Sequence, residues 1–315
     1  MKNRKVLVAG SVAYDTFLHY GKSFVDGIDP KALDELSMSF LMESCTKNFG
    51  GTGLNSAWNL KLIGLDPILT ATVGRDGDTC LQLLKEKKIR TDLIRKLDDE
   101  VTANATIATD SEGHQITFFH SGASGLRSWP VDLNPKDIGY AIITPSSPTL
   151  TLTGLLWCKE KNIPCIFDPG QELLSFSKEE VLQAIALSAG VVMNAYEAGL
   201  LTTLIDKPEE KIAKLTPYFI VTHGHHGFVI YEGQKMEGRP RVDADIVINP
   251  TGAGDAFRAG VIYGRLHDWT LMEGAQLGAA LASKVVEQEG ALLPDIDIDE
   301  IRERAKKTYG SPLPH

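Results

Sequence analysis

Short apolar runs alternate with segments of helical periodicity from residue 140 onward, and this alternation constrains the fold more than any other feature. The predicted strands and helices follow one another at residues 141–144, 150–161, 164–168, 178–189, 191–194, 196–203 and 218–222. Strands that alternate with helices build right-handed βαβ units, which produce a parallel sheet covered by helices on both faces. We therefore predict an α/β fold, a Rossmann-type sandwich with a mostly parallel central sheet flanked by helices.

The N-terminal part of the chain predicts a second, smaller sheet. Apolar runs at 6–10 and 68–73 are typical of buried strands of the central sheet. Residues 102–109 and 114–120 instead alternate in polarity around the turn sequence Asp110-Ser111-Glu112-Gly113. Alternating segments joined by such a turn indicate a β-hairpin. We expect this hairpin to lie outside the central sheet.

A long excursion between core elements usually has a function, and residues 20–49 form one, because they carry no clean helical stripe. We assign segments at about 14–49 and 102–120 to a small β-sheet lid, and the whole chain, residues 1–315, to one domain. Near the C-terminal end, the apolar runs 228–231 and 246–248 predict an antiparallel edge of the central sheet.

Composition excludes several classes of protein. The chain of 315 residues is 43% hydrophobic, and its 32 basic and 41 acidic residues give a net charge of −9. A nucleic-acid-binding surface needs clustered Lys and Arg, so we expect no nucleic-acid partner. The four cysteines form no CxxC pair, and no apolar run approaches the roughly 18 residues of a membrane span. We expect a cytoplasmic protein without a membrane partner.

The stretch Thr251-Gly252-Ala253-Gly254-Asp255 opens a predicted helix that continues to about Leu266. Glycines at a helix start leave backbone N–H groups uncovered, and these groups together with the helix dipole attract an anion. The carboxylate of Asp255 stands directly behind them. Donors for a phosphoryl group beside a proton acceptor are what phosphoryl transfer to a hydroxyl requires. Taken alone, the motif is equally compatible with a tight turn and a helix-capping Asp.

Polar residues follow several predicted strands, at the edge where ligands bind in open α/β sheets. Asp15 lies just past the first strand, and Thr222-His223-Gly224 ends a later one. Asn194 and Glu197 lie three apart at a helix start, which suits a Mg²⁺ ion near a phosphate but equally an ordinary capping box. The glycine-rich stretch Gly50-Gly51-Thr52-Gly53-Leu54-Asn55 opens another helix and permits close approach of a ligand to the backbone.

With these motifs in this order, the chain resembles the ribokinase-like (PfkB) carbohydrate kinase family along nearly its whole length. The stretch 50–55 is similar to the family's first signature, a sugar-binding element, and 251–255 is similar to the second, which holds the anion hole and the catalytic base. Asn194-x-x-Glu197 resembles the Mg²⁺/phosphate motif, and 222–224 the nucleotide-binding strand end. Within the family, the stretches 10–15, 114–120, 167–171 and 255–260 are similar to bacterial and archaeal nucleoside (adenosine) kinases.

The resemblance implies a function for each matching residue. It implies catalysis by Asp255, Gly252, Ala253 and Gly254. It implies acceptor binding by Asp15, Gly51, Asn55, Gln115 and Phe118. It implies nucleotide binding by Asn194, Thr222, Gly224 and Gly227, and metal binding by Glu197 and Asn194.

The same resemblance implies the reaction and its cofactors, ATP and Mg²⁺. The γ-phosphate of ATP would pass to the 5′-hydroxyl of a purine nucleoside, adenosine first, or alternatively to a free sugar such as ribose or fructose. A nucleotide-binding sensor without catalysis is a rival of another class, disfavoured by the intact Asp255. Two copies of the chain could pair through the lid as a homodimer. Asn249 stands where many relatives have Asp, which leaves activation by a monovalent cation open.

Overall fold

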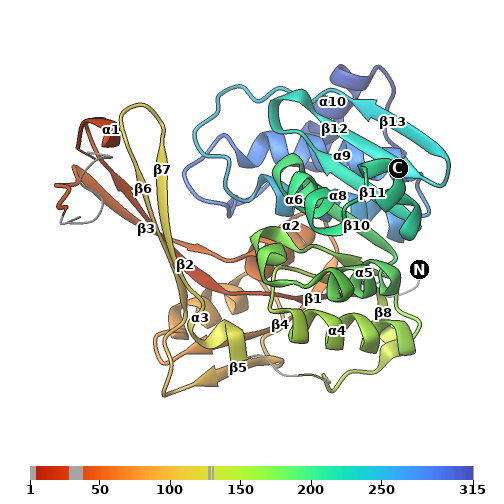
Figure 1. Ribbon diagram of the computed structural model, residues 1–315, viewed down its shortest axis with the longest axis horizontal. Coiled ribbons are helices and arrows are strands. Elements are labelled where there is room, and N and C mark those ends of the chain that lie inside the picture. The colour runs from red at the N-terminus through yellow and green to blue at the C-terminus, as the bar shows by residue number, and fades with distance from the viewer. Residues whose placement is uncertain (1–4, 28–37, 127–128, 130, 315) are drawn as a thin grey trace.

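The computed structural model describes all residues except 1–4, 28–37, 127–128, 130 and 315. Its described part consists of a large α/β body and a small sheet that projects from one side of it (Figure 1). Among the described helices, none has the length and apolar character needed to cross a membrane.

The body is built on a nine-stranded sheet, and its strands are parallel from β5 to β11. In spatial order the strands are β13 (Lys235–Arg239), β12 (Phe228–Glu232), β11 (Tyr218–Thr222), β10 (Gly190–Asn194), β9 (Cys165–Phe167), β8 (Ile138–Ile143), β1 (Lys5–Ala9), β4 (Asp66–Gly74) and β5 (Ile94–Leu97). Strands β12 and β13 add an antiparallel edge. The predicted α/β fold with a mostly parallel central sheet is confirmed.

One part of the predicted antiparallel edge is wrong. Residues 246–248 form no strand, and the edge is instead β13, a run of mostly exposed residues. Ile246, Val247 and Ile248 are 59%, 62% and 54% exposed. The backbone N–H of Ile248 donates to the carbonyl of Val286 at 2.8 Å, so this segment is held by the loop after a helix rather than by a neighbouring strand. An apolar run therefore did not mark a buried strand here.

Two hydrophobic layers, one on each face of the sheet, hold the body together. Strand β1 shows why, because Val6 and Val8 enter one layer while Leu7 and Ala9 enter the other. The first layer is covered by α2 (Thr52–Leu62), α3 (Asp78–Glu86), α8 (Ala253–Leu266), α9 (Leu271–Val285) and α10 (Ile298–Tyr309). The second is covered by α4 (Pro148–Glu160), α5 (Lys178–Leu187), α6 (Ala195–Ile205) and α7 (Glu209–Ile212). A parallel sheet buried on both faces requires this arrangement.

Helices α8 and α9 meet along a seam of glycines. A Cβ atom built on Gly260 would lie 2.2 Å from the backbone nitrogen of Gly278, and one on Gly264 would lie 2.6 Å from the Cα of Gly274. The two backbones are therefore in direct contact, and no side chain of any size fits between them. This seam fixes α8, which begins at the motif 251–255, against the rest of the body.

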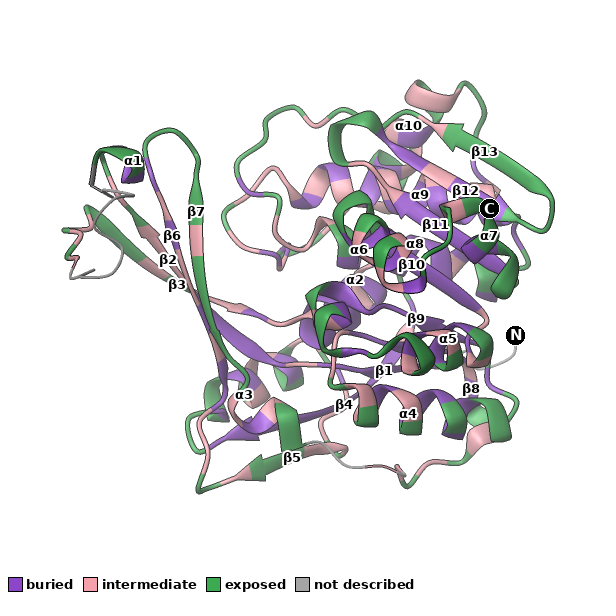
Figure 2. Cartoon of the chain, in the orientation of Figure 1, coloured by how far each residue is buried: buried purple, intermediate pink, exposed green. Residues whose placement is uncertain are grey.

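The projecting sheet has four strands in the order β3 (Ser44–Gly50), β2 (Ala13–His19), β6 (Ala103–Thr109) and β7 (Gln115–His120). Strands β2 and β6 pair in parallel, while the outer pairs are antiparallel. The small sheet and its hairpin, predicted from the sequence, are both present. Its distal part is largely exposed (Figure 2), where Tyr20 and the short helix α1 (Phe24–Gly27) pack against Phe40. We call this sheet the lid; residues 28–37 of the predicted lid lie outside the described residues.

Candidate active site

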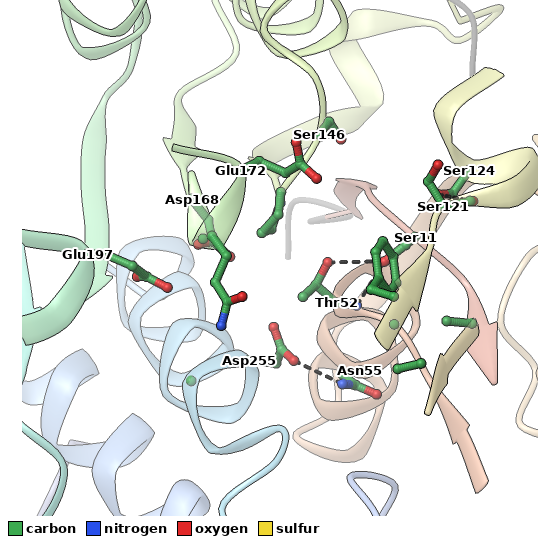
Figure 3. A pocket seen from close by; sticks show the side chains of 18 of the residues that line it. Ser11, Thr52, Asn55, Ser121, Ser124, Ser146, Asp168, Glu172, Glu197 and Asp255 are labelled. Carbon is green, nitrogen blue, oxygen red and sulfur yellow. Dashed lines mark hydrogen bonds between the residues drawn. The ribbon is translucent and has the colours of Figure 1, made fainter. Parts of the chain in front are cut away.

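A cavity of about 880 Å³ lies between the carboxyl edge of the body sheet and the base of the lid. Its volume falls in the range of small-molecule sites. Figure 3 shows Asp255 and Asn55 facing each other on its floor, with Glu197 and Asp168 to one side and Ser121 and Ser124 to the other. The body contributes the charged residues other than Asp15, and the lid contributes Asp15 together with Ala13, Ala105, Ile107 and Phe119 among others.

The glycine motif forms a tight cradle at the start of α8. Gly252, the N-cap, has φ of +85°, and a Cβ on it would lie 2.5 Å from the Cβ of Ala291. Only glycine satisfies both constraints. Thr251, Gly252 and Gly254 line the cavity, whereas Ala253 is not among the described lining residues and donates its N–H to the carbonyl of Pro250 at 3.2 Å. The helix N-terminus thus faces the cavity as an anion-binding element.

Asp255 lies in the first turn of α8 and is only 5% exposed. Its Oδ2 accepts a hydrogen bond from Asn55 Nδ2 at 3.0 Å, and its Oδ1 one from Ser56 Oγ at 3.5 Å. Burial raises the pKa of Asp255 to about 6, against the lowering effects of Arg258 and Asn55. Such a carboxylate is ionised at neutral pH and still basic enough to accept a proton in a transition state.

Three of the predicted acceptor-binding residues, Asp15, Gly51 and Asn55, line the cavity beside Asp255. Asp15, on β2, is 8% exposed, and burial together with the charge of Asp255 raises its pKa to about 6. Gly50 makes room for it, since a Cβ there would lie 1.9 Å from Asp15 Oδ2. The turn at Gly51, with φ of +95°, then starts α2 and directs Asn55 to the cavity floor.

The structure does not place the other two, Gln115 and Phe118, in the cavity. Gln115 begins β7, where its Nε2 donates to Thr109 Oγ1 at 3.1 Å. Phe118 is 67% exposed and faces away, whereas its neighbour Phe119 lines the cavity. Successive side chains of a strand point to opposite faces, so a one-residue difference decides which Phe reaches the site.

On the opposite side, Asn194, Glu197 and Thr222 line the cavity, at the carboxyl ends of β10 and β11. Asn194 and Glu197 also form the capping box that the sequence left open: Asn194 Oδ1 accepts from the N–H of Glu197 at 2.9 Å, and Glu197 Oε2 accepts from the N–H of Asn194 at 2.8 Å. Gly224 and Gly227 lie in the turn after β11, outside the described lining of the cavity.

Two residues that we did not assign to the site from the sequence complete its floor. Asp168, at the end of β9, and Arg258, one turn after Asp255 on α8, form a buried ion pair at 2.6 Å. Burial raises the pKa of Asp168, and the guanidinium of Arg258 opposes this effect. The sequence contained a signal for both residues: Asp168 lies at the end of a predicted strand, and Arg258 lies three residues after the candidate base Asp255.

The charges of the cavity fit a nucleotide only together with a metal ion. Among the described lining residues the carboxylates are Asp15, Asp168, Glu172, Glu197 and Asp255, and the cationic side chain is Arg258. A triphosphate would be repelled by this set unless a cation bridged the two. Carboxylate and amide oxygens are the ligands that Mg²⁺ prefers, and Glu197 and Asn194 supply both on the side opposite the lid.

A parallel sheet with a projecting lid, and a buried carboxylate beside a glycine cradle, define a phosphotransferase that acts on a hydroxyl group. A family model described as "pfkB family carbohydrate kinase" matches residues 12–298. The chain belongs to this family, so the family resemblance expected from the sequence is confirmed.

Known proteins are similar over nearly the full chain. The nucleoside kinase of Methanocaldococcus jannaschii is 31% identical over 313 residues, which cover 97% of this chain and 98% of the relative. A structure of Burkholderia thailandensis nucleoside kinase in complex with inosine superposes with a TM-score of 0.88 at 30% identity, covering 98% of this chain and 100% of that chain. The same kinase in complex with ADP-inosine superposes with a TM-score of 0.84 at 31% identity, covering 98% and 97%.

Proposed function

We propose that this chain is an ATP-dependent, Mg²⁺-dependent kinase that phosphorylates the 5′-hydroxyl of a purine nucleoside, with adenosine or inosine as acceptor. One observation carries the proposal: the cavity gathers Asp15, Asn55 and Asp255 in a chain that is about 30% identical to a nucleoside kinase described in complex with inosine. The complex of that kinase with ADP-inosine supports a nucleotide as the second ligand. A product of this kind would serve purine salvage.

The acceptor's ribose would lie between Asp15, Asn55 and Gly51, with its 5′-hydroxyl directed at Asp255. Asp255 accepts the hydroxyl proton as the hydroxyl attacks, and the bond between the γ-phosphorus and its bridging oxygen breaks. Backbone N–H groups of the cradle at Gly252 and Gly254 stabilise the charge on the phosphoryl group. Mg²⁺, held from Glu197 and Asn194, would neutralise the charge of the polyphosphate. Thr222, with Gly224 and Gly227 behind it, would support the rest of the nucleotide.

The lid side of the cavity suits a flat base better than a small sugar. Ala13, Ala105 and Ile107 form an apolar surface with room in front of it, and Phe119 stands beside them. A purine would cover this surface and exclude water from the reacting groups, whereas ribose or fructose would leave it open. Aromatic contacts add about 0.5–1.5 kcal/mol beyond area burial, enough for roughly a tenfold preference.

The deciding experiment compares adenosine, inosine, ribose and fructose as acceptors at equal concentration with saturating MgATP. We expect both nucleosides to exceed both sugars by at least about tenfold in kcat/KM. A sugar that is phosphorylated faster would replace the nucleoside as acceptor and leave the kinase in place. Absence of phosphorylation of all four would favour a nucleotide sensor.

Two further features belong to the proposal. The four cysteines are free thiols, as is typical of proteins in a reducing compartment, and we assign the protein to the cytoplasm. A homodimer through the lid is supported by the apolar side chains on its surface, Leu41 at 89% and Phe118 at 67% exposed. Sedimentation of wild type and Phe118→Asp tests it: the variant should be monomeric if the lids pair, and equal masses would reject this interface.

A further inference from the structure

Arg258 carries the one cationic side chain among the described residues that line the cavity. It is 8% exposed, so its charge is largely removed from water. A buried guanidinium is retained in a fold only when it is paired and hydrogen-bonded, because an unpaired buried charge costs several kcal/mol. Its partners therefore indicate what it does.

The guanidinium of Arg258 is hydrogen-bonded to Asp168 on one side. On its other side it lies near Asp255 without a hydrogen bond. Its Nη2 donates to Asp168 Oδ1 at 2.6 Å and reaches the carbonyl of Val192 at 3.5 Å. Its Nη1 lies 3.8 Å from Asp255 Oδ1, which is an ion-pair distance but too long for a hydrogen bond. Residues i and i+3 share one face of a helix, so Arg258 stays beside Asp255 by construction.

Gly254 shows that the guanidinium also lies against the cradle. A Cβ on Gly254 would come within 2.8 Å of Arg258 Nη1. The absence of a side chain at this position therefore leaves space for the guanidinium directly behind the backbone that faces the cavity. A positive charge there adds to the partial positive charge of the helix N-terminus.

We propose that Arg258 is the positioning residue of the phosphoryl-transfer site: anchored by Asp168, it steadies Asp255 and adds positive charge beneath the glycine cradle. The inference rests on the proposed kinase function. Asp168 has a defined part in it, because its hydrogen bond keeps the guanidinium from closing on Asp255. A direct hydrogen bond from Arg258 would add to the long one that Asp255 Oδ1 accepts from Ser56 Oγ at 3.5 Å and would weaken the base. The anchored geometry keeps the charge close without that additional bond.

The test uses the full-length protein with MgATP and the acceptor that the wild type phosphorylates. Arg258→Met removes the charge and keeps a similar volume, and Arg258→Lys keeps the charge but loses the planar fork. The double variant Asp168→Asn/Arg258→Met removes both charges of the pair. Arg304→Met is the matched control, because Arg304 forms a partly buried ion pair with Glu287 at 2.6 Å outside the described cavity lining.

We expect Arg258→Met to lower kcat by about 100-fold with both KM values within about threefold, since the lost interaction is made in the transition state. Arg258→Lys should lose about tenfold, and the double variant should be no slower than Arg258→Met within about twofold. Arg304→Met should keep the wild-type kcat. All rates are divided by the concentration of nucleotide-binding sites measured by calorimetry, so that unfolded protein is not counted as slow protein.

Wild-type kcat in folded Arg258→Met or Arg258→Lys would overturn the inference, because a purely structural ion pair changes the unfolding temperature and not the rate per site. If Arg258→Met does not fold, Arg258→Lys decides alone: a loss of about threefold or more supports the inference, and a smaller loss overturns it. The proposed function fails separately, when the wild type itself phosphorylates no nucleoside. The ratio of variant to wild type is measured with whichever acceptor the wild type uses.

Discussion

The two walls of the cavity differ in almost every physical property. The body wall carries Asp255, Asp168 and Arg258, each at most 8% exposed and held by strand ends and helix starts. The lid wall carries Phe119, which is 55% exposed on an edge strand. A buried, hydrogen-bonded wall resists rearrangement, whereas a thin exposed sheet opens at little cost. We therefore propose that the body wall carries out the chemistry and that the lid wall recognises the base of the acceptor.

Asp255→Asn should have the largest effect on activity, and it should impair catalysis on the body wall without impairing the binding of either substrate. The amide keeps the shape of the side chain but accepts no proton, so kcat should fall by at least about 100-fold while KM for MgATP and nucleoside stays near wild type. Steady-state kinetics with both substrates varied measures this. A variant with wild-type kcat would remove Asp255 from the mechanism.

Lowering the pH should protonate Asp255 on the body wall and its lid neighbour Asp15 over the same range. Both carboxyls have pKa values raised from 3.8 to about 6, so each is about half protonated at pH 6 and mostly protonated below it. Since the base must be ionised, kcat/KM should fall about tenfold for each unit of pH below 6. Initial rates from pH 5 to 8 measure the profile, and a profile that stays flat to pH 5 would contradict it.

The stability of the ligand-free protein should move in the opposite direction. A carboxyl whose pKa is raised by folding binds its proton more tightly in the folded state, so its contribution to folding improves as the pH falls from 6 towards 4. Urea unfolding of wild type and Asp255→Asn should show that the free energy of unfolding of the wild type rises relative to that of the variant as the pH falls over this range. A difference that is constant with pH would show that Asp255 titrates normally.

The lid side is tested by two neighbouring aromatics on β7. Phe119→Ala should raise the nucleoside KM about tenfold with little change in kcat, because the residue lines the cavity without touching the phosphoryl group. Phe118→Ala is the matched control and should stay within about twofold. A larger effect from Phe118 would mean that the lid closes with its other face toward the acceptor.

The smallest effect is expected for the metal. Glu197→Gln should raise the Mg²⁺ concentration for half-maximal rate a few-fold, about 1 kcal/mol, because the charge is lost while Gln still serves the capping box. Glu273→Gln is the control, since Glu273 forms the same capping box with Thr270 on α9. An unchanged titration for Glu197→Gln would leave Asn194 and Glu197 with a capping function alone.

The body was far easier to predict from the sequence than the lid. Strands such as β10 and β11 are buried on both faces, and their continuous apolar runs are visible without knowledge of any partner. Strand β3 has no such run, and its conformation depends on pairing with β2, for example Cys45 opposite Leu18. The error at 246–248 has the same origin, because apolar character alone does not reveal which segment a backbone will pair with.

The same limit applies to the site. The motifs 50–55 and 251–255 are local, and the residues Asn55 and Asp255 that they contain are hydrogen-bonded to each other across 200 positions. Asp168 and Arg258 lie 90 positions apart, in the separate stretches 167–171 and 255–260, so only the fold brings them together. The sequence did not show that Phe119 rather than Phe118 lines the cavity, because the face of a hairpin that points to a cavity depends on how the hairpin docks.

The glycine seam between α8 and α9 determines the order in which parts of the protein open. Helices in backbone contact cannot slide or tilt without losing that contact along their length, so amide protons of α8 should exchange with solvent only when the whole body unfolds. Amides of the exposed strand β7 need only a local opening. On warming, the lid should therefore open well before α8, the helix that carries Asp255, unfolds. Inactivation should at first be reversible on cooling.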